Sequence, residues 1–238
     1  MHLKFAKYFM FIWILLSISV TSCSLEQSST YFPLEEGLKW RYQVTKTTRD
    51  GIQQQKYIYT SLDDRIVEGQ AVSVRKSVDG SLFYYRETEE GLLYVGKEIQ
   101  SGVAREFLRD EHFILRYPLL ERKQWQDITA TKLLVKTGPP QKTVFKIEAE
   151  IPLKVLVDAL EETIVVPAGI FHHCIKITKQ GSEFKDAGNY IGRTIVRVKE
   201  TSWYAPGVGL VKSIREETTE SQALDKGQLI IELDLFES

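Results

Sequence analysis

The feature that most constrains this fold is a regular alternation of short β-rich segments with turn residues. Runs of Val, Ile, Thr, Tyr and Phe are interrupted by signals such as Asp50-Gly51, Asp79-Gly80 and Pro206-Gly207. The interruptions recur about every 8–12 residues, a spacing typical of antiparallel meanders. The residue types between them suit a pleated, half-buried surface. We therefore predict an all-β fold: one large curved antiparallel meander sheet, half-barrel-like or an open barrel, with at most one short helix.

Most strands follow directly from this punctuation, but two stretches need comment. Residues 152–162 place apolar side chains near helical spacing and could form either the one helix or a strand with Pro152 at an edge. Residues 182–189 are polar and are expected to form a loop, and Glu68-Gly69-Gln70 could form a local turn. The expected strands cover residues 38–48, 52–62, 65–78, 82–88, 92–99, 103–108, 125–136, 143–151, 163–166, 170–179, 190–204, 208–218 and 228–236.

One sequence pattern occurs twice. Pro33 precedes Trp40 by the same spacing by which Pro118 precedes Trp125, and each proline is followed by Leu and closely preceded by Tyr. Each segment could place its Trp at the first inward position of a strand whose entry is fixed by the proline. Either two sub-sheets are built alike, which would give one curved sheet of about a dozen strands, or the repetition is a coincidence in a Leu-rich chain.

The first 22 residues have the three zones of an export signal. Met1–Lys7 carries two lysines and no acid, and Tyr8–Val20 is apolar apart from two serines. The apolar run has 13 residues, short of the roughly 17–25 that a membrane-spanning helix needs. We therefore predict a signal peptide over residues 1–22 rather than a transmembrane anchor.

The signal ends in Val20-Thr21-Ser22-Cys23, which resembles the lipobox of bacterial lipoproteins. In that family the cysteine thiol is acylated, the chain is cut just before it, and the new N-terminus is acylated too. The resemblance implies that Cys23 is the lipid-attachment residue and the first residue of the mature chain. Two or more acyl chains are needed for stable anchoring. An ordinary secretory signal that happens to contain a cysteine is the alternative.

The remaining chain divides in two. Residues 23–30 carry the lipidated cysteine and a polar tether without periodicity, and residues 31–238 are expected to form a single all-β domain. Ser24 follows the cysteine, at the position where an Asp retains Gram-negative lipoproteins in the inner membrane. The resemblance therefore implies a cell-envelope location, at the outer membrane facing the periplasm if the host is Gram-negative, with the membrane as a partner through the N-terminal lipid.

Charge and cysteine content argue against two classes of protein. The chain has 31 basic and 32 acidic residues, and loss of the signal leaves 29 against 32, a net charge near −3. Nucleic-acid binding needs a concentrated basic face, so no nucleic-acid partner is expected. With Cys23 acylated, Cys174 has no intramolecular partner, so no disulfide framework is expected. Cys174 lies in an apolar-rich run and is expected in the core.

Three further segments resemble a family of uncharacterised bacterial lipoproteins. Residues 31–42 resemble that family's FPL-G-W-Y opening, residues 166–174 its VPAG-F-C turn, and residues 203–212 its WYAPGVGLVK hairpin. Ile170 stands where the family usually has Thr, and Glu36 where it has a small or basic residue. The resemblance implies an open, curved β-sheet, more distantly similar to periplasmic lipoprotein carriers with a half-barrel, and it supplies no catalytic residue.

No residue set in the sequence indicates catalysis or a cofactor. His172-His173-Cys174 is the one metal-like cluster; on a strand His172 and Cys174 would share a face, and zinc would need further ligands. The preferred interpretation is a His pair at the edge of a turn beside a buried Cys. The G-x-S-x-G elbow, H-E-x-x-H, the P-loop and the dinucleotide fingerprint are absent from the sequence. Acidic clusters at turns are expected to be solvated. We predict no catalytic residue, no metal and no cofactor.

Three functional hypotheses remain. The preferred one is a non-enzymatic, membrane-anchored binding or envelope-maintenance protein whose curved sheet holds an apolar small molecule or an envelope protein. Aromatic residues that share a strand face, such as Tyr57 and Tyr59, could line such a concave surface, or they could fill the core. The alternative is a purely structural or protein-interaction domain without a ligand. An enzyme is the third hypothesis, and the motif search does not support it.

Overall fold

The structure confirms the all-β architecture. It is a computed structural model that describes residues 31–101, 104–139, 142–188 and 191–238. Apart from one short 3₁₀ helix, η2 (Gln222–Leu224), the regular structure of these residues consists of strands. The strands are β1 (Lys39–Thr48), β2 (Gly51–Val67), β3 (Gln70–Ser77), β4 (Leu82–Thr88), β5 (Gly91–Ser101), β6 (Ala104–Arg116), β7 (Gln124–Ala130), β8 (Val135–Gly138), β9 (Thr143–Lys146), β10 (Glu150–Val166), β11 (Gly169–Asp186), β12 (Arg193–Ala205), β13 (Gly209–Thr218) and β14 (Lys226–Glu237).

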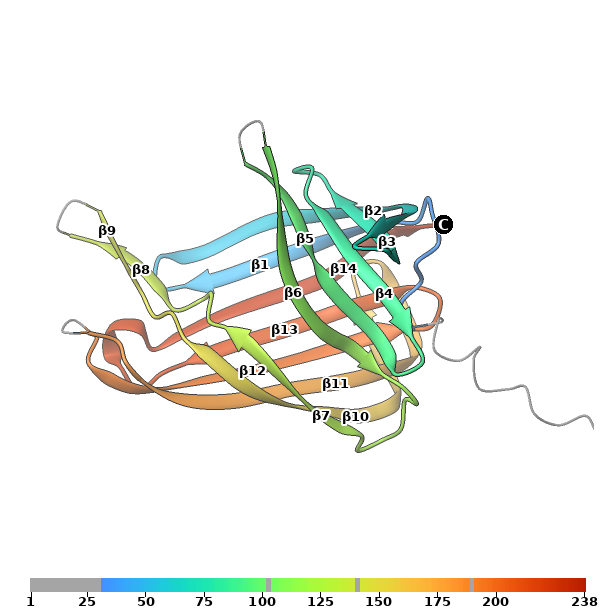
Figure 1. Ribbon diagram of the computed structural model, residues 1–238. Helices are drawn as coiled ribbons and strands as arrows, with labels where there is room; N and C mark the ends of the chain where they lie inside the picture. The colour runs from blue at the N-terminus through green and yellow to red at the C-terminus, as the bar shows by residue number, and fades with distance from the viewer. Residues whose placement is uncertain (1–30, 102–103, 140–141, 189–190) are drawn as a thin grey trace, which may run out of the picture.

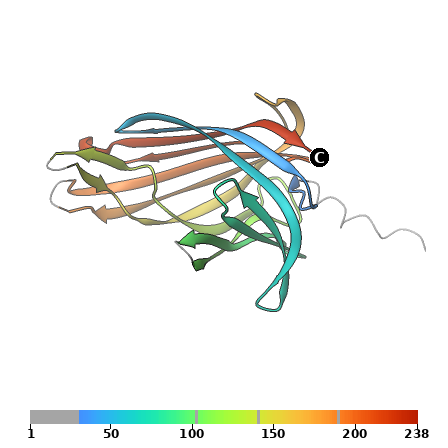
Figure 2. The same ribbon diagram turned by 90° about the horizontal axis from the view of Figure 1, so that it is seen from above.

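Twelve strands form one antiparallel sheet in the order β6-β5-β4-β3-β2-β1-β14-β13-β12-β11-β10-β7, and β8 pairs with β9 in a separate hairpin. The sheet contains two six-stranded meanders, a first half (β1–β6) and a second half (β7 and β10–β14), joined where β1 pairs with β14. Strand twist curls it until it is nearly closed into a barrel-like shape (Figure 1 and Figure 2). The expected dozen-strand curved sheet is therefore confirmed.

Side chains fill much of the space inside the curled sheet. One cluster of buried side chains packs β1, β13 and β14 against the β10–β11 hairpin. Another packs the chain around β8 and β9 onto β10 and β12. Burial of this apolar surface is the main favourable contribution to folding. The largest cluster joins β4–β6 and the N-terminal segment to β7 and β10–β12 through Phe32, Tyr85, Leu92, Leu115, Trp125, Val155, Val157, Ile175, Ile177 and Tyr204.

The helix considered for residues 152–162 is not formed, and the strand alternative is confirmed. In β10 the buried residues alternate as Ile151, Leu153 and Val155, which is a period of two. Pro152 lies opposite Ile128 of β7 and precedes the residues of β10 that pair with β11. Its missing N–H is therefore accommodated where the strand has a neighbour on one side.

Several strand boundaries predicted from the sequence are wrong. The strand expected over 103–108 continues to Arg116, and the strands expected over 125–136 and 143–151 are each divided in two. Two further differences fall on polar stretches. β2 does not end at residue 62 but continues through Asp63 and Asp64, where its pairing with β3 is irregular, and turns at Glu68-Gly69. Similarly, β11 continues through Asp186, so most of the expected loop over residues 182–189 is strand. In both places polar residues occupy an exposed strand, where cross-strand pairing decides the conformation rather than local composition.

The repeated Pro and Trp pattern marks the start of each half. Trp40 and Trp125 are each the second residue of the first strand of their half, and both are buried. The residues that surround the two prolines contact the same interior cluster. They are Tyr31, Leu34, Tyr117 and Leu119.

Part of the backbone conformation repeats as well, although only the Tyr117-Pro118 bond of the two is cis. Gly37 and Arg122, each four residues after the proline, have left-handed φ values of 87° and 65°. The N–H of Gly37 donates to the Ser61 carbonyl over 3.1 Å, and the N–H of Arg122 donates to the Val157 carbonyl over 2.8 Å. In return, the N–H of Ser61 donates to the Leu38 carbonyl over 2.8 Å, and the N–H of Val157 donates to the Lys123 carbonyl over 3.0 Å.

The fourth strand of each half also carries the same irregularity. In β4 a bulge against β5 falls between Tyr84 and Tyr85, and in β12 a bulge against β13 falls between Trp203 and Tyr204. Tyr85 and Tyr204 both enter the main interior cluster. Because hydrogen-bond register and bulge position match between the halves, two sub-sheets built alike are favoured over a chance repetition of sequence.

Candidate functional site

The two junctions between the halves differ. β1 and β14 pair from Lys39↔Glu237 to Thr47↔Gln228. β6 and β7 occupy the corresponding positions at the other junction, yet within the described ranges they do not pair with each other. We call the boundary between these two edge strands the seam (Figure 1).

A pocket of about 460 Å³ lies at the seam, within the size range of small-ligand sites. We call it the seam pocket. Both edge strands contribute to it, and its floor comes from β10–β13. Most of its lining residues are polar or charged. They are Asp110, His112, Asp127, Ile128, Thr129, Ala130, Lys132, Glu150, Leu153, Lys179, Glu200 and Arg215.

Arg215 is the centre of the floor, and its side chain is only 4% exposed. Its Nε donates to Glu217 over 2.8 Å, and Nη1 donates to Thr129 over 3.0 Å and to Glu200 over 3.2 Å. Nη2 donates to the Ala130 carbonyl over 2.8 Å. One guanidinium therefore ties edge strand β7 to β12 and β13, in the multidentate manner that arginine geometry permits.

Glu217 holds the segment that follows β7. Its fully buried carboxylate accepts hydrogen bonds from the backbone amides of Lys132, at 3.1 Å, and Leu133, at 2.9 Å. Together with Arg215 these donors satisfy a charge that would otherwise be costly to bury. The contacts fix the position of the chain as it leaves the seam.

The other cations of the floor also lie close to carboxylates. Lys179 and Asp127 pair over 2.8 Å with little exposure. For Glu200, burial acts to raise the pKa, but the cations Lys179, Lys132 and Arg215 together outweigh it, so the pKa lies below its ordinary value. Burial, followed by the nearby Arg215 charge, lowers the pKa of Lys132. Arg215, Lys179 and Lys132 thus face a larger number of carboxylates, because Asp110 and Glu150 also line the pocket and Glu217 lies behind Arg215.

On the side of β6 the pocket is lined by one ring, that of His112. The His112 ring lies 5.1 Å from the Tyr94 ring, which lies 5.7 Å from the Tyr85 ring. Along the inner face of the first half several rings are only partly buried against the core, so the interior has an aromatic wall and a charged wall. The partly buried rings are Tyr57, Tyr59, Phe83 and Tyr94.

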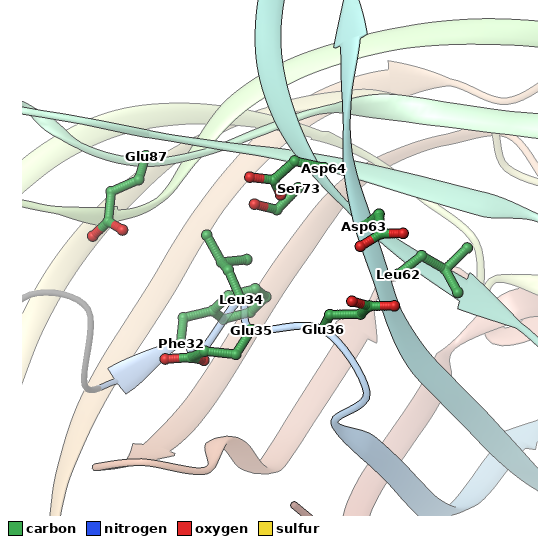
Figure 3. A pocket seen from close by; sticks show the side chains of 9 residues that line it. All are labelled: Phe32, Leu34, Glu35, Glu36, Leu62, Asp63, Asp64, Ser73 and Glu87. Carbon is green, nitrogen blue, oxygen red and sulfur yellow. The ribbon is translucent and has the colours of Figure 1, made fainter.

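A second cleft, of about 480 Å³, lies beside the irregularity in β2 (Figure 3). The side chains of Asp63 and Glu36 are hydrogen-bonded, and this bond raises the pKa of Glu36 above its ordinary value. No group of three or more His, Cys, Asp or Glu in the described part of the chain is arranged to hold a metal ion. The lining residues are Phe32, Leu34, Glu35, Glu36, Leu62, Asp63, Asp64, Ser73 and Glu87.

Arg75, behind this acidic cleft, has a structural role. Its guanidinium carbon lies 3.9 Å from the ring centroids of both Phe32 and Trp40. One nitrogen donates to the Pro33 carbonyl over 2.8 Å. Burial lowers the pKa of Arg75, while two aromatic faces compensate part of the lost hydration. The contacts attach the N-terminal segment to β3.

His172 and Cys174 do not share a strand face as predicted, whereas the preferred interpretation of a His pair beside a buried Cys is confirmed. His173 has a left-handed φ of 56°, which breaks the strand alternation, so both histidines are exposed while Cys174 is buried. His172 contacts Thr163 and His173 contacts Glu161. Cys174 lies in the core as expected, and burial raises its pKa to about 11, which disfavours a reactive thiolate.

The seam residues were not predicted from the sequence. One signal was present: along β13 the inward residues run Val211, Ser213, Arg215 and Glu217, so the buried face changes from apolar to charged. Charged residues at the buried positions of an alternating strand indicate a buried network. Sequence spacing could not show that β7 and β12 would supply their partners.

The predicted lipid-attachment residue Cys23, the signal peptide and the tether lie outside the described residues. The N-terminal end of the described chain is held by Tyr31, whose hydroxyl donates to the His173 carbonyl over 3.1 Å. Among the described residues, no helix is long and apolar enough to cross a membrane.

Comparison with known proteins gives two structural matches. No family model matches the chain, and no curated protein matches its sequence. A Bacteroides fragilis protein described as exported, with a YmcC-like fold, is 14% identical with a TM-score of 0.43. A Parabacteroides distasonis protein described as a lipoprotein is 13% identical with a TM-score of 0.38. Each match covers 88% of this chain and 99% of the other. Both TM-scores lie below 0.5.

Proposed function

We propose that the chain is a non-enzymatic binding protein of the cell envelope, held at a membrane by lipid on Cys23 and binding its ligand at the seam. The lipobox-like sequence before Cys23 supports the anchor. The seam pocket supports the binding role, because it has the volume of a small-ligand site and lies where two edge strands are left without each other as partners. This pocket is the observation on which the proposal rests.

The two walls of the interior suggest the kind of ligand. Partly buried rings such as Tyr94 and His112 offer flat apolar contact, while Glu200 and Lys179 offer charged hydrogen-bonding groups. Carboxylates outnumber the cations of the pocket, so it does not favour a strongly anionic molecule. The proposed ligand is an amphipathic molecule with one apolar face and several polar groups, more polar than the apolar cargo expected from the sequence.

The arrangement of the charged groups favours binding over catalysis. A general acid or base needs a reacting group within hydrogen-bond reach. Here Arg215 and Glu217 are engaged with each other and with backbone groups of the same chain. Such pairs hold a site in shape, and the proposal assigns them that role.

Native mass spectrometry of the full-length chain, isolated from bacterial membranes in mild detergent, tests both parts of the proposal. A mature chain that begins at Cys23 with covalent acyl groups would support the anchor, and an unmodified chain would contradict it. A reproducible non-covalent added mass would support binding. A clean mass without a ligand would favour the structural or protein-interaction alternative.

Two histidine variants connect any added mass to the seam. His112→Ala removes a ring from the pocket and should reduce the bound fraction. The matched control is His172→Ala, an exposed histidine outside the pocket lining, which should retain it. Equal retention by both variants would place the ligand elsewhere.

A further inference from the structure

The β10–β11 hairpin folds across the end of the sheet where the N-terminal segment and the C-terminus lie (Figure 2). We call residues 161–174 the flap. On its inner face Val166 and Cys174 are buried in the same cluster as Val211 and Leu233. The amide of Ala168, at the turn of the flap, donates to the Leu233 carbonyl over 3.0 Å. The inner face is thus part of the core.

The outer face of the flap carries an exposed aliphatic pair. Val165 and Ile170 are direct cross-strand partners, with 68% and 62% of their surface exposed. Their side chains add nothing to the core beneath them. Beside them, the charged groups of the flap are engaged: Glu161 with His173, and Glu162 with Lys176 over 3.2 Å.

The short tether limits which part of the domain can meet a membrane. Tyr31 is bonded to the flap through the His173 carbonyl. If Cys23 carries the lipid, the eight-residue step to Tyr31 spans at most about 28 Å. β14 alone has 12 residues, a length of about 40 Å. The end with the flap is therefore held near the bilayer, and the opposite end of an upright domain is out of reach.

We infer that the flap docks on the membrane surface, with Val165 and Ile170 inserted among the lipid headgroups. This inference rests on the lipid anchor of the proposed function. Exposed aliphatic residues also occur at the other end, for example Ile52 and Val144, so the tether rather than exposure decides between the ends. Two aliphatic side chains bind a bilayer weakly, but a covalent anchor holds them at high effective concentration. The acidic cleft lies at the flap end of β2, so neutral phospholipids are the favoured surface.

Fluorophores at two matched isoleucines test the docking. Ile170 and Ile52 each follow a turn glycine, are similarly exposed, and lie at opposite ends of the domain. Ile170→Cys and Ile52→Cys, each in a Cys174→Ala background, are labelled with an environment-sensitive fluorophore. The full-length lipidated chains are reconstituted in phosphatidylcholine vesicles that contain brominated acyl chains, and flotation reports the anchor separately.

The expected result is flotation of both chains, with loss of fluorescence for the label at Ile170 and none at Ile52. Adding Val165→Asp should abolish that loss without changing flotation. Floating chains in which neither label is quenched, or both are quenched equally, would overturn the docking while leaving the anchor intact. Chains that do not float would refute the anchor itself, and the docking with it.

Discussion

The closed junction between β1 and β14 and the seam between β6 and β7 start from equivalent positions and differ in the side chains that face inward. Counted from Trp40 and Trp125, Tyr42 corresponds to Asp127. At the closed junction Tyr42 lies opposite Leu233, and both are buried. At the seam, Asp127 instead accepts a hydrogen bond from Lys179. Apolar inward residues complete the sheet at one junction, and polar residues line a pocket at the other.

A second difference lies in the irregular strand that follows. Three residues beyond the equivalent Ser61 and Val157, the first half has Asp64 and the second half has Leu160. Leu160 packs against the main interior cluster, whereas Asp64 lines the acidic cleft. The same backbone plan thus tolerates an open polar cleft where its counterpart is filled. In each half, then, a charged residue stands where the counterpart is packed in the core: Asp64 against Leu160, and Asp127 against Tyr42.

The largest expected effect comes from giving the closed junction the polarity of the seam. Leu233→Asp would bury a carboxylate opposite Tyr42 without a cation and should cost about 5 kcal/mol of unfolding free energy. Urea unfolding measures the loss. Leu235→Asp, on the same strand but 37% exposed, should cost less than about 1 kcal/mol. Similar costs for both would show that the junction does not depend on apolar packing.

The buried ion network at the seam should be nearly as sensitive. Arg215→Met leaves Glu217 buried without its cation and should cost about 3–5 kcal/mol. Adding Glu217→Gln should restore part of that loss, because the amide oxygen still accepts from the backbone. Arg197→Met, which breaks an exposed pair with Glu220, is the control and should cost under about 1 kcal/mol. A cost for Arg215→Met no larger than the control would contradict the network.

Sequence reasoning predicted the parts of this structure that depend on local chemistry. Alternation and turn glycines gave the strands, and the spacing of Trp40 and Trp125 gave the start of each half. It did not predict the seam, because the pairing of edge strands and the meeting of Arg215 with Glu200 depend on how the whole sheet curls. The positive φ at His173 was equally hidden, because histidine, although enriched at left-handed positions, adopts them in only a small fraction of cases.

A smaller effect tests whether the two entry segments are equivalent. Gly37→Ala places a β-carbon at a left-handed position with open space around it and should cost about 1 kcal/mol. Arg122→Gly relieves the same conformation in the second half and should gain up to about 1 kcal/mol. Thermal unfolding of both variants measures the pair. Changes of the same sign would show that the segments do not share a backbone conformation.

The smallest expected effect is a change in acid sensitivity. The pKa of Glu200 is lowered in the folded chain, so it contributes stability that is complete above its ordinary pKa of 4.5 and lost as pH falls through the lower folded value. Glu200→Gln should therefore show a shallower loss of stability below about pH 4.5 than the unmodified chain. Urea midpoints at several pH values measure it. If the loss of stability at low pH were the same in the variant, the three cations would not stabilise this carboxylate.

Hydrogen exchange of the full-length chain, followed by mass spectrometry, tests the difference between the junctions most directly. The account predicts slow exchange for peptides from both β1 and β14, whose amides are paired with neighbours on either side. It predicts faster exchange for peptides from β6 and β7, because each has one sheet edge without a strand partner among the described residues. Equally slow exchange at both junctions would mean that the seam closes in solution and would contradict the account.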